Sequence, residues 1–374
     1  MRKDTPEIMN KKLIKTAAIV SAMTLLLAGC GKSGDSGQTT TEAGALQEIN
    51  IDAKDPQMMN VDPNAVVTKD GQVINDLNGS WYSYEESRKR PVAVMINNLD
   101  AAMPQSGIGK ADIIYEMLAE GGITRLMAVF SDYSGLDKIG PVRSARQYFD
   151  RRGALEHDAI FVHFGDSYLA AADFETYPID HLDGMTQSGF YRDNSRVAPH
   201  NAYTSADLIN QMIESNGFRT EKKDDYKSIF SWNVNDTDLP EGSACNKLVT
   251  AYHSSRKPWF EYDAETKTYK RFQYGGPQID DQTGEQLAFK NVIVQFVEHT
   301  IPVEGDYLID LTLVGSGDAY IATDGKITAI KWEKDDMMGV TRYTYRDGTP
   351  VRLNPGKTWV TMFHNDQIPD VTFE

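Results

Sequence analysis

The sequence lacks an excess of positive charge. Its 38 Lys and Arg residues are outnumbered by 54 Asp and Glu residues, which gives a formal net charge of −16. A surface of this charge repels polyanions, so we expect no nucleic-acid partner. A local group of basic residues can still bind a small anion against this acidic background.

The sequence also lacks an apolar run long enough to cross a bilayer, which takes about 20 residues. Its N-terminal run, Ala17 to Leu27, is shorter and follows a basic segment with Arg2, Lys3, Lys11, Lys12 and Lys15. This order is typical of a secretory signal peptide, so we predict that residues 1–29 are removed. Five basic and two acidic residues leave with them, so the net charge changes from −16 to −19.

The end of this signal, Leu27-Ala28-Gly29-Cys30, resembles the lipobox of bacterial lipoproteins. In that motif the cysteine thiol receives a diacylglycerol, and cleavage then makes this cysteine the new N-terminus. It carries acyl chains such as palmitate. Two or three chains make a stable membrane anchor, because each buried methylene contributes about 0.8 kcal/mol. We predict lipid attachment at Cys30 and a location on the outer face of the cell membrane. The alternative is an ordinary secretory signal with a chance cysteine.

Cysteine is scarce, since the 374 residues include only Cys30 and Cys245. Lipidation of Cys30 would leave Cys245 as the only free thiol. No intramolecular disulfide is then possible. An oxidising exterior therefore adds nothing to the stability of the fold, which must come from packing.

Composition divides the mature chain into three parts. Residues 30–80 are rich in Gly, Ser, Thr, Asp, Asn and Gln, which predicts a flexible tether that follows the lipidated cysteine. Residues 81–217 alternate apolar runs with helical patterns, which predicts an α/β domain with a mixed sheet and helices. Residues 218–374 alternate short apolar runs with hairpin dipeptides such as Asp324-Gly325, which predicts a β-rich antiparallel domain.

The apolar runs give the positions of the expected strands. Val92–Ile96 is continuously apolar, which predicts a strand buried on both faces. The other expected strands are 113–118, 126–130, 159–164, 292–297, 308–314, 319–322, 327–332 and 359–363. The expected helices are 144–156, 169–176 and 206–214.

Residues 138–152 carry five basic residues and one acidic residue, which stands out in so acidic a chain. Arg143 and Arg146 lie there, and Ser144 has the place of an N-cap for the expected helix. A helix start presents unpaired N–H groups and partial positive charge, so arginines there suit a phosphate or carboxylate. We predict an anion site. The alternative is pairing of these arginines with nearby carboxylates, Glu116 and Glu120 among them.

Two further segments hold candidate residues. His163 ends an expected strand, and if that strand is parallel to 126–130, His163 opens onto the same sheet edge as the arginines. The polar loop 191–201 precedes a helix and adds basic residues. The full predicted ligand-binding set is Arg125, Arg143, Ser144, Arg146, His163, Arg192, Arg196 and His200. For both histidines the alternative is a structural hydrogen-bonding role.

Motifs for a metal, a cofactor or a nucleophile are missing. The residues with metal-binding atom types are His163, Asp166, His181, Asp183 and His200. No pair has His-x-x-x-His spacing and none resembles a calcium loop, so we predict no metal. The sequence has no P-loop, dinucleotide fingerprint or Gly-x-Ser-x-Gly elbow, so we predict no cofactor and assign no catalytic residue.

Several motifs occur together in a fixed order: Arg90-Pro91-Val92-Ala93-Val94-Met95-Ile96-Asn97-Asn98, Pro104-Gln105-Ser106-Gly107, Glu120-Gly121-Gly122-Ile123-Thr124-Arg125, Gly140-Pro141-Val142-Arg143-Ser144-Ala145-Arg146 and Ala198-Pro199-His200-Asn201. Together they resemble the YerB family of lipoproteins of Gram-positive bacteria, over most of the chain after the tether. The resemblance implies an exported protein with a β-rich C-terminal part. Because that family has no established activity, the resemblance assigns no catalytic residue.

The leading hypothesis is a membrane-anchored extracytoplasmic lipoprotein that binds a small anionic or phosphorylated cell-envelope ligand. One alternative is an enzyme that modifies envelope polymers, a hydrolase or a transferase, with His163 or Asp166 as acid or base. A second alternative is a structural or adaptor protein whose β-rich part docks another envelope protein. The sequence identifies no protein partner and leaves open whether the protein is an enzyme.

Overall fold

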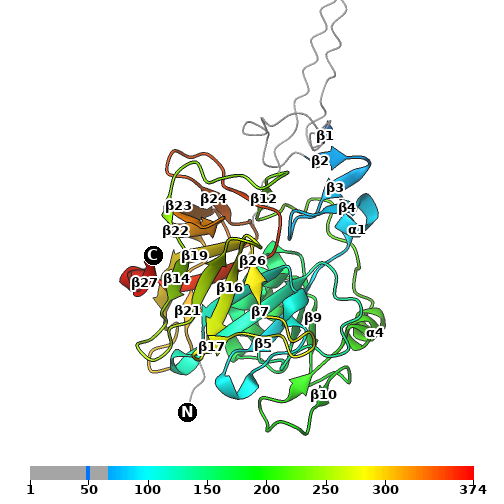
Figure 1. Ribbon diagram of the computed structural model, residues 1–374. Helices are drawn as coiled ribbons and strands as arrows, with labels where there is room; N and C mark the ends of the chain where they lie inside the picture. The colour runs from blue at the N-terminus through cyan, green and yellow to red at the C-terminus, as the bar shows by residue number, and fades with distance from the viewer. Residues whose placement is uncertain (1–47, 51–65) are drawn as a thin grey trace, which may run out of the picture. The chain divides into compact units, whose positions relative to one another are not determined.

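The structure is a computed structural model that describes residues 48–50 and 66–374, drawn as the coloured ribbon in Figure 1. The predicted signal peptide and the predicted lipid-attachment residue Cys30 lie outside these residues. None of the described helices is long and apolar enough to span a membrane.

An eleven-stranded mixed sheet forms the centre of the fold. Its strands, in spatial order, are β13 (Ser243–Ala244), β23 (Lys326–Lys334), β22 (Gly315–Thr323), β19 (Asn291–Val297), β26 (Thr358–His364), β6 (Ile113–Leu118), β7 (Thr124–Phe130), β5 (Val92–Asn97), β8 (Ile160–His163) and β9 (His181–Asp183), with β24 (Arg342–Thr344) paired to β23. The parallel pair β26–β6 joins the two halves of the chain. Strands of both predicted domains therefore share one sheet, and the described residues all belong to one compact unit.

Smaller sheets surround the main one. A six-stranded antiparallel sheet contains β17 (Gly276–Pro277), β16 (Thr268–Gln273), β15 (Trp259–Asp263), β14 (Lys247–Thr250), β27 (Val371–Phe373) and β18 (Ala288–Phe289). A four-stranded sheet contains β1 (Glu48–Asn50), β2 (Val66–Lys69), β3 (Gln72–Ile74) and β4 (Trp81–Ser83). Two-stranded pairs are β10 (Tyr191–Arg192) with β11 (Ala202–Tyr203), β12 (Ser231–Trp232) with β25 (Arg352–Leu353), and β20 (His299–Thr300) with β21 (Asp310–Leu311). Only β21 forms within the strand expected at 308–314.

The helices are short. The α-helices are α1 (Tyr84–Arg88), α2 (Gln147–Asp150), α3 (Tyr168–Thr176) and α4 (Ala206–Asn216), and a π-helix, η5 (Arg151–Glu156), continues α2. The 3-10 helices are η2 (Asp100–Ala102), η3 (Ile108–Lys110), η4 (Glu120–Gly122) and η6 (Asn365–Asp370). Side-chain N-caps at Ser167 and Ser205 start α3 and α4, and left-handed Gly217 ends α4.

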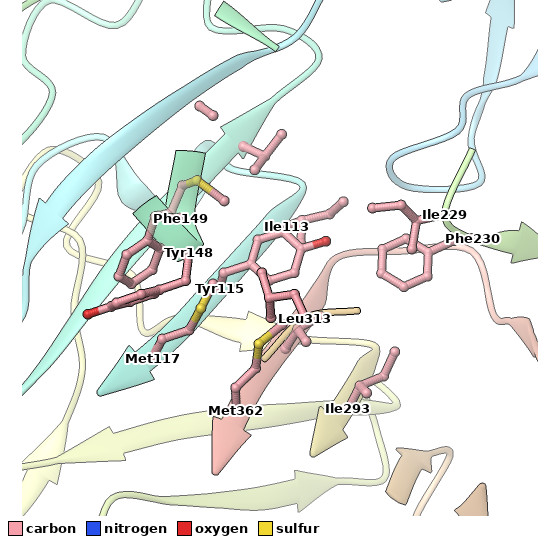
Figure 2. Packing of buried hydrophobic residues seen from close by; sticks show 14 of the residues in the cluster. Ile113, Tyr115, Met117, Tyr148, Phe149, Ile229, Phe230, Ile293, Leu313 and Met362 are labelled. Atoms are coloured by element: carbon pink, nitrogen blue, oxygen red, sulfur yellow. The ribbon is translucent and has the colours of Figure 1, made fainter. Parts of the chain in front are cut away.

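The interior strands β5, β6, β7, β19 and β26 of the main sheet are buried on both faces, as their continuously apolar runs predict. In β5, Ala93 and Met95 face one core, while Val94 and Ile96 face the other. The first core includes residues of α2, η5 and α3, and Figure 2 shows its packing around β6, β19 and β26. The second core includes residues of α4 and of the six-stranded sheet. The predicted fold class, a mixed sheet with helices followed by a mainly antiparallel β-rich part, is confirmed.

The predicted end of the tether, residue 80, is too late in the chain. Strands β2 and β3 form between residues 66 and 74, and the Leu77 side chain is buried in the first core. The two strands are joined at Asp70-Gly71, where both residues have positive φ. Asp-Gly is a hairpin dipeptide, so this turn was a readable signal inside a polar stretch.

Candidate functional site

The candidate site lies at one edge of the main sheet, where β5, β6, β8 and β9 end and β7 begins (Figure 1). The condition that the strand ending at His163 runs parallel to residues 126–130 is not met. Strand β5 lies between β8 and β7, parallel to β8 and antiparallel to β7. His163 still reaches the same edge as Arg125, because Arg125 lies at the start of β7 rather than at its end.

The arginine segment enters this edge between the ends of β5 and β8. The Arg143 N–H donates to the Met95 carbonyl at 3.0 Å, and the Phe164 N–H donates to the Arg143 carbonyl at 3.0 Å. The Ala145 N–H donates to the Gly165 carbonyl at 2.9 Å. Backbone pairing therefore brings Arg143 next to the segment that follows His163, at the same sheet edge.

The third predicted segment joins them through His200. The Asn97 side-chain nitrogen lies 2.8 Å from Nδ1 of His200, and Arg143 Nη1 donates to the Pro199 carbonyl at 3.4 Å. Partial burial and the nearby Arg143 both lower the pKa of His200. His200 is thus close to Arg143 and is held by an internal hydrogen bond.

The other two arginines of this loop have internal partners. Arg192 lies 4.9 Å from the centre of the Phe164 ring and donates to Asn201 Oδ1 at 2.8 Å. Arg196 donates to the carbonyls of Ala102 at 2.6 Å and Pro104 at 2.8 Å. These contacts fix the loop against its neighbours, so we assign both arginines a role in positioning the loop.

Three arginines and one glutamate form what we call the arginine cluster: Arg125, Arg143, Arg146 and Glu120. Arg146 donates to both Glu120 oxygens, at 2.5 and 2.8 Å, and Arg125 lies 3.6 Å from the same carboxylate. Arg143 takes part in no ion pair with any residue that the structure describes. The cluster thus carries two positive charges more than its one carboxylate can neutralise.

The surplus charge of the arginine cluster affects its pKa values. Burial, followed by repulsion from Arg146, lowers the pKa of Arg125 to about 10. The same two causes, in the same order, lower the pKa of Arg143. Burial alone would raise the pKa of Glu120, but Arg146 and Arg125 together bring it below its ordinary value. An added anion would therefore relieve repulsion among the arginines.

Ser144 is not a helix N-cap, contrary to the prediction. Helix α2 begins at Gln147 with Arg146 as its N-cap residue, and the Ser144 hydroxyl donates to the Phe164 carbonyl at 3.1 Å. The backbone around Ser144 is already committed to pairing with Gly165, which delays the helix. Because α2 has only four residues, its N-terminus is no anion site by itself, and the guanidinium groups must supply the recognition.

Two histidines form a hydrogen-bonded relay beside the arginine cluster. His163 Nδ1 lies 2.9 Å from the Gly165 carbonyl, and His163 Nε2 lies 2.9 Å from His181 Nδ1. The carbonyl can only accept, so Nδ1 of neutral His163 carries the proton and Nε2 accepts from His181. Burial lowers the pKa of His163 to about 4 and also lowers that of His181. The relay ends at Nε2 of the half-buried His181.

Two cavities outside this cluster were missed by sequence reasoning. One of about 300 Å³ is lined by residues including Glu116, Thr124, Tyr252, Arg256 and Tyr274. A wider groove of about 1210 Å³ is lined by residues including Trp81, Tyr82, Tyr84 and Tyr133. The readable signal for the first was Glu116 inside an apolar strand. Its side chain is fully buried and pairs with Arg271 at 2.7 Å, not with the arginine cluster.

Fold and sequence together place the chain in a class of two-part proteins, with a mixed-sheet N-terminal part and a β-rich C-terminal part. Residues 77–219 match the family model "Protein of unknown function (DUF3048) N-terminal domain", and residues 248–360 match the DUF3048 C-terminal domain. The chain belongs to this family, which confirms the resemblance to YerB.

Two relatives document the assignment. The Bacillus subtilis (strain 168) protein named "Putative lipoprotein YerB" is 31% identical over 299 residues, which cover 79% of this chain and 86% of that protein. The crystal structure of YerB from Bacillus subtilis superposes with a TM-score of 0.71 at 30% identity, covering 80% of this chain and 98% of the YerB chain. The fold of this family therefore extends over most of the described residues.

Proposed function

We propose that this chain is a lipid-anchored extracytoplasmic protein that binds a small anionic or phosphorylated cell-envelope ligand at the arginine cluster. The observation that carries the proposal is the sharing of one carboxylate, Glu120, by the cations Arg125 and Arg146, with Arg143 beside them in no ion pair to any described residue. A phosphate offers several acceptor oxygens, which suit the forked donors of guanidinium groups.

The anchor is supported by the lipobox-like Leu27–Cys30 and by the name of the YerB relative, which is that of a lipoprotein. Replacing Cys30 by alanine tests it in cells that express the full chain. We expect the parent chain in the membrane fraction, and the Cys30→Ala chain outside it. Retention of the variant in membranes as a lipid-free protein would contradict the anchor.

Anion binding is tested by calorimetric titration of the full chain with inorganic phosphate and with glycerol phosphate. We expect Arg143→Ala to weaken binding at least tenfold, which corresponds to about 1.4 kcal/mol. The matched control is Arg342→Ala, since Arg342 is half-exposed on β24 and pairs with Asp335 at 2.8 Å. Equal binding by both variants, or no binding by the parent chain, would contradict the proposal.

A second candidate function is a hydrolase or transferase that acts on envelope polymers. The histidine relay favours it, because Gly165 and His163 orient His181 so that its outer nitrogen is left as a base. Turnover of a labelled lipid-linked envelope precursor by the full chain, lost in His181→Gln, would support this function. Binding without turnover would favour the first.

A further inference from the structure

A group of metal-ligating side chains lies next to the arginine cluster. His163, Asp166 and Asp183 each offer one ligand atom, and these atoms all lie within 4.8 Å of one another. His163 and Asp183 are register partners on the parallel strands β8 and β9, which directs both side chains to the same side of the sheet. Asp166 follows His163 by three residues, in the loop that leaves β8.

The two carboxylates differ in a way that suits metal ligands. Asp183 Oδ1 accepts the backbone N–H groups of Gly165 at 2.7 Å and Met185 at 3.0 Å, which fix its orientation. Asp166 is exposed and accepts no hydrogen bond from any residue in the described part of the chain. One carboxylate is therefore held rigidly, while the other can swing toward an ion.

We propose that His163, Asp166 and Asp183 bind a divalent transition-metal ion of the Zn²⁺ or Mn²⁺ type. Nδ1 of His163 lies 3.7 Å from Asp183 Oδ1 and is the nitrogen that faces this carboxylate. The Gly165 carbonyl, 2.9 Å from the same nitrogen, is a fourth donor atom. One imidazole among oxygen donors suits these borderline ions better than Mg²⁺ or Ca²⁺, which prefer oxygen alone.

Ligation by Nδ1 requires a change of tautomer, and the relay provides it. Without metal, Nδ1 carries the His163 proton and His181 donates to Nε2. With metal, His163 carries its proton on Nε2 and donates to Nδ1 of His181, whose own proton moves to its outer nitrogen. Both imidazoles remain neutral and no net proton is released. The His163–His181 contact then acts as the outer-shell hydrogen bond that orients a metal-bound histidine.

This proposal departs from the sequence prediction of no metal, and the departure has a structural reason. Spacing rules such as His-x-x-x-His describe ligands on one helix face. Here His163 and Asp183 are twenty positions apart and meet only because β8 and β9 are neighbours in parallel register. Strand pairing of this kind has no fixed spacing in the sequence.

The proposal does not depend on anion binding at the arginine cluster, although the two sites adjoin. The Gly165 carbonyl, one of the proposed metal donors, accepts the N–H of Ala145. Ala145 immediately precedes Arg146 in the chain, so the proposed metal site adjoins the arginine cluster. An ion at this position would add a further positive centre for a phosphate oxygen. Metal binding should therefore strengthen phosphate binding, and the test can measure the two separately.

The test is titration of the full chain with Zn²⁺ and Mn²⁺ after chelator treatment, followed by calorimetry and metal analysis. We expect one tightly bound equivalent, and at least tenfold weaker binding in Asp166→Asn. Because Asp166 is exposed, this variant should fold, and a thermal melt without metal verifies that it does. Asp207→Asn, on the exposed start of α4, is the matched control and should bind like the parent chain.

The remaining outcomes are also decisive. Equal binding by the parent, Asp166→Asn and Asp207→Asn would mean scattered surface sites and would overturn the proposal, as would the absence of binding. His163→Gln, if it folds, should also lose the equivalent. Arg143→Ala should keep the metal and lose phosphate, so failure of the metal site and failure of the anion site are distinguishable.

Discussion

Two charged clusters in this protein have cations in excess around a single glutamate, yet they differ in burial. The arginine cluster places Glu120 among arginines at the sheet edge, where the Glu120 side chain is 14% exposed. The other, which we call the buried cluster, places Glu156 between Arg152 and Lys334, with all three side chains 0% exposed. The positive charge in excess is two at the arginine cluster and one at the buried cluster, so an excess of cations occurs both at the sheet edge and in a fully buried setting.

The charged groups of the buried cluster are hydrogen-bonded to one another and to neighbouring protein groups. Glu156 accepts from Lys334 Nζ at 2.9 Å, from Arg152 Nη1 at 2.8 Å and from the Thr341 N–H at 2.8 Å. Arg152 also donates to Gln295 Oε1 at 3.2 Å. No ligand can reach these groups, so their role is to join η5 to β23 and β19. At the arginine cluster, Arg143 has no such closure, and accessibility separates a structural cluster from a candidate binding site.

Glu156→Gln should have the largest effect on stability. The change leaves Arg152 and Lys334 buried without their counter-charge, which costs about 3–5 kcal/mol of unfolding free energy. Urea denaturation measures this loss. The control is Glu333→Gln, one residue from Lys334 on the exposed side of β23, which should change stability little. A loss below 1 kcal/mol for Glu156→Gln would remove the structural role of the buried cluster.

Glu120→Gln should cost less, about 1–2 kcal/mol, because the Arg125 and Arg146 side chains are 7% and 10% exposed, whereas those of the buried cluster are fully buried. The pKa of Glu120 is lowered in the folded protein, so its contribution is present above the unfolded value of 4.5 and disappears as the pH falls below it. The stability difference from the parent chain should therefore shrink toward zero at acidic pH. Phosphate binding should strengthen, since the arginines lose their internal anion. A loss as large as that of Glu156→Gln would make both clusters structural.

Much of the fold could be predicted from local patterns. The run Val92–Ile96 gave a central strand, because a continuous apolar run is stable only when both faces are covered. The helix expected at 206–214 is α4, with its Ser205 cap. Strand order and direction could not be predicted, because they depend on which distant strands pair. The parallel pairing of β26 with β6, which joins the two halves, has no signal in either strand alone.

The sequence could indicate that the arginine segment and His163 lie at one sheet edge, but not which partners their side chains have. The structure places Arg143, Arg146 and His163 at the same sheet edge. The signal in the sequence was that basic and polar residues follow the ends of the expected strands. The partner of Glu116 was not readable, since Arg271 lies 155 positions away and competes with the nearer arginines. The cap role given to Ser144 failed because backbone pairing with Gly165 outcompeted helix formation at that point. Local helix propensity is a weak preference, and tertiary hydrogen bonds of this kind can override it.

Asp150 differs from both clusters, because it is a buried carboxyl group that forms no ion pair in the described part of the chain. It lies in α2, beside the first core. Burial, and then the nearby Asp173, raise its pKa well above the ordinary value. The stability from its protonated form is present below the unfolded value of 3.8 and is lost as the pH rises. Asp150→Asn should therefore stabilise the protein by about 1 kcal/mol at pH 7 and have little effect near pH 4.

The control for Asp150 is its neighbour Asp173, which pairs with Arg151 at 2.6 Å. Asp173→Asn removes an ion pair rather than a repulsion, so stability should fall where Asp150→Asn raises it. Urea denaturation of both variants at pH 7 and pH 4 gives the comparison. If Asp150→Asn destabilised the protein at pH 7, the carboxylate would have to be ionised and paired, and the contrast with the two clusters would be lost.

Arg143→Ala should have the smallest effect on stability, within about 0.5 kcal/mol of the parent chain, because no ion pair between described residues is lost. Removal of the side chain also relieves repulsion with Arg146, which partly offsets the lost packing. Arg146→Ala, in contrast, breaks the two hydrogen bonds to Glu120 and should destabilise the protein measurably. Denaturation and phosphate titration of the same two variants separate a binding arginine from a structural one. If Arg143→Ala lost stability and kept phosphate binding, the accessible cluster would be no different in kind from the buried one.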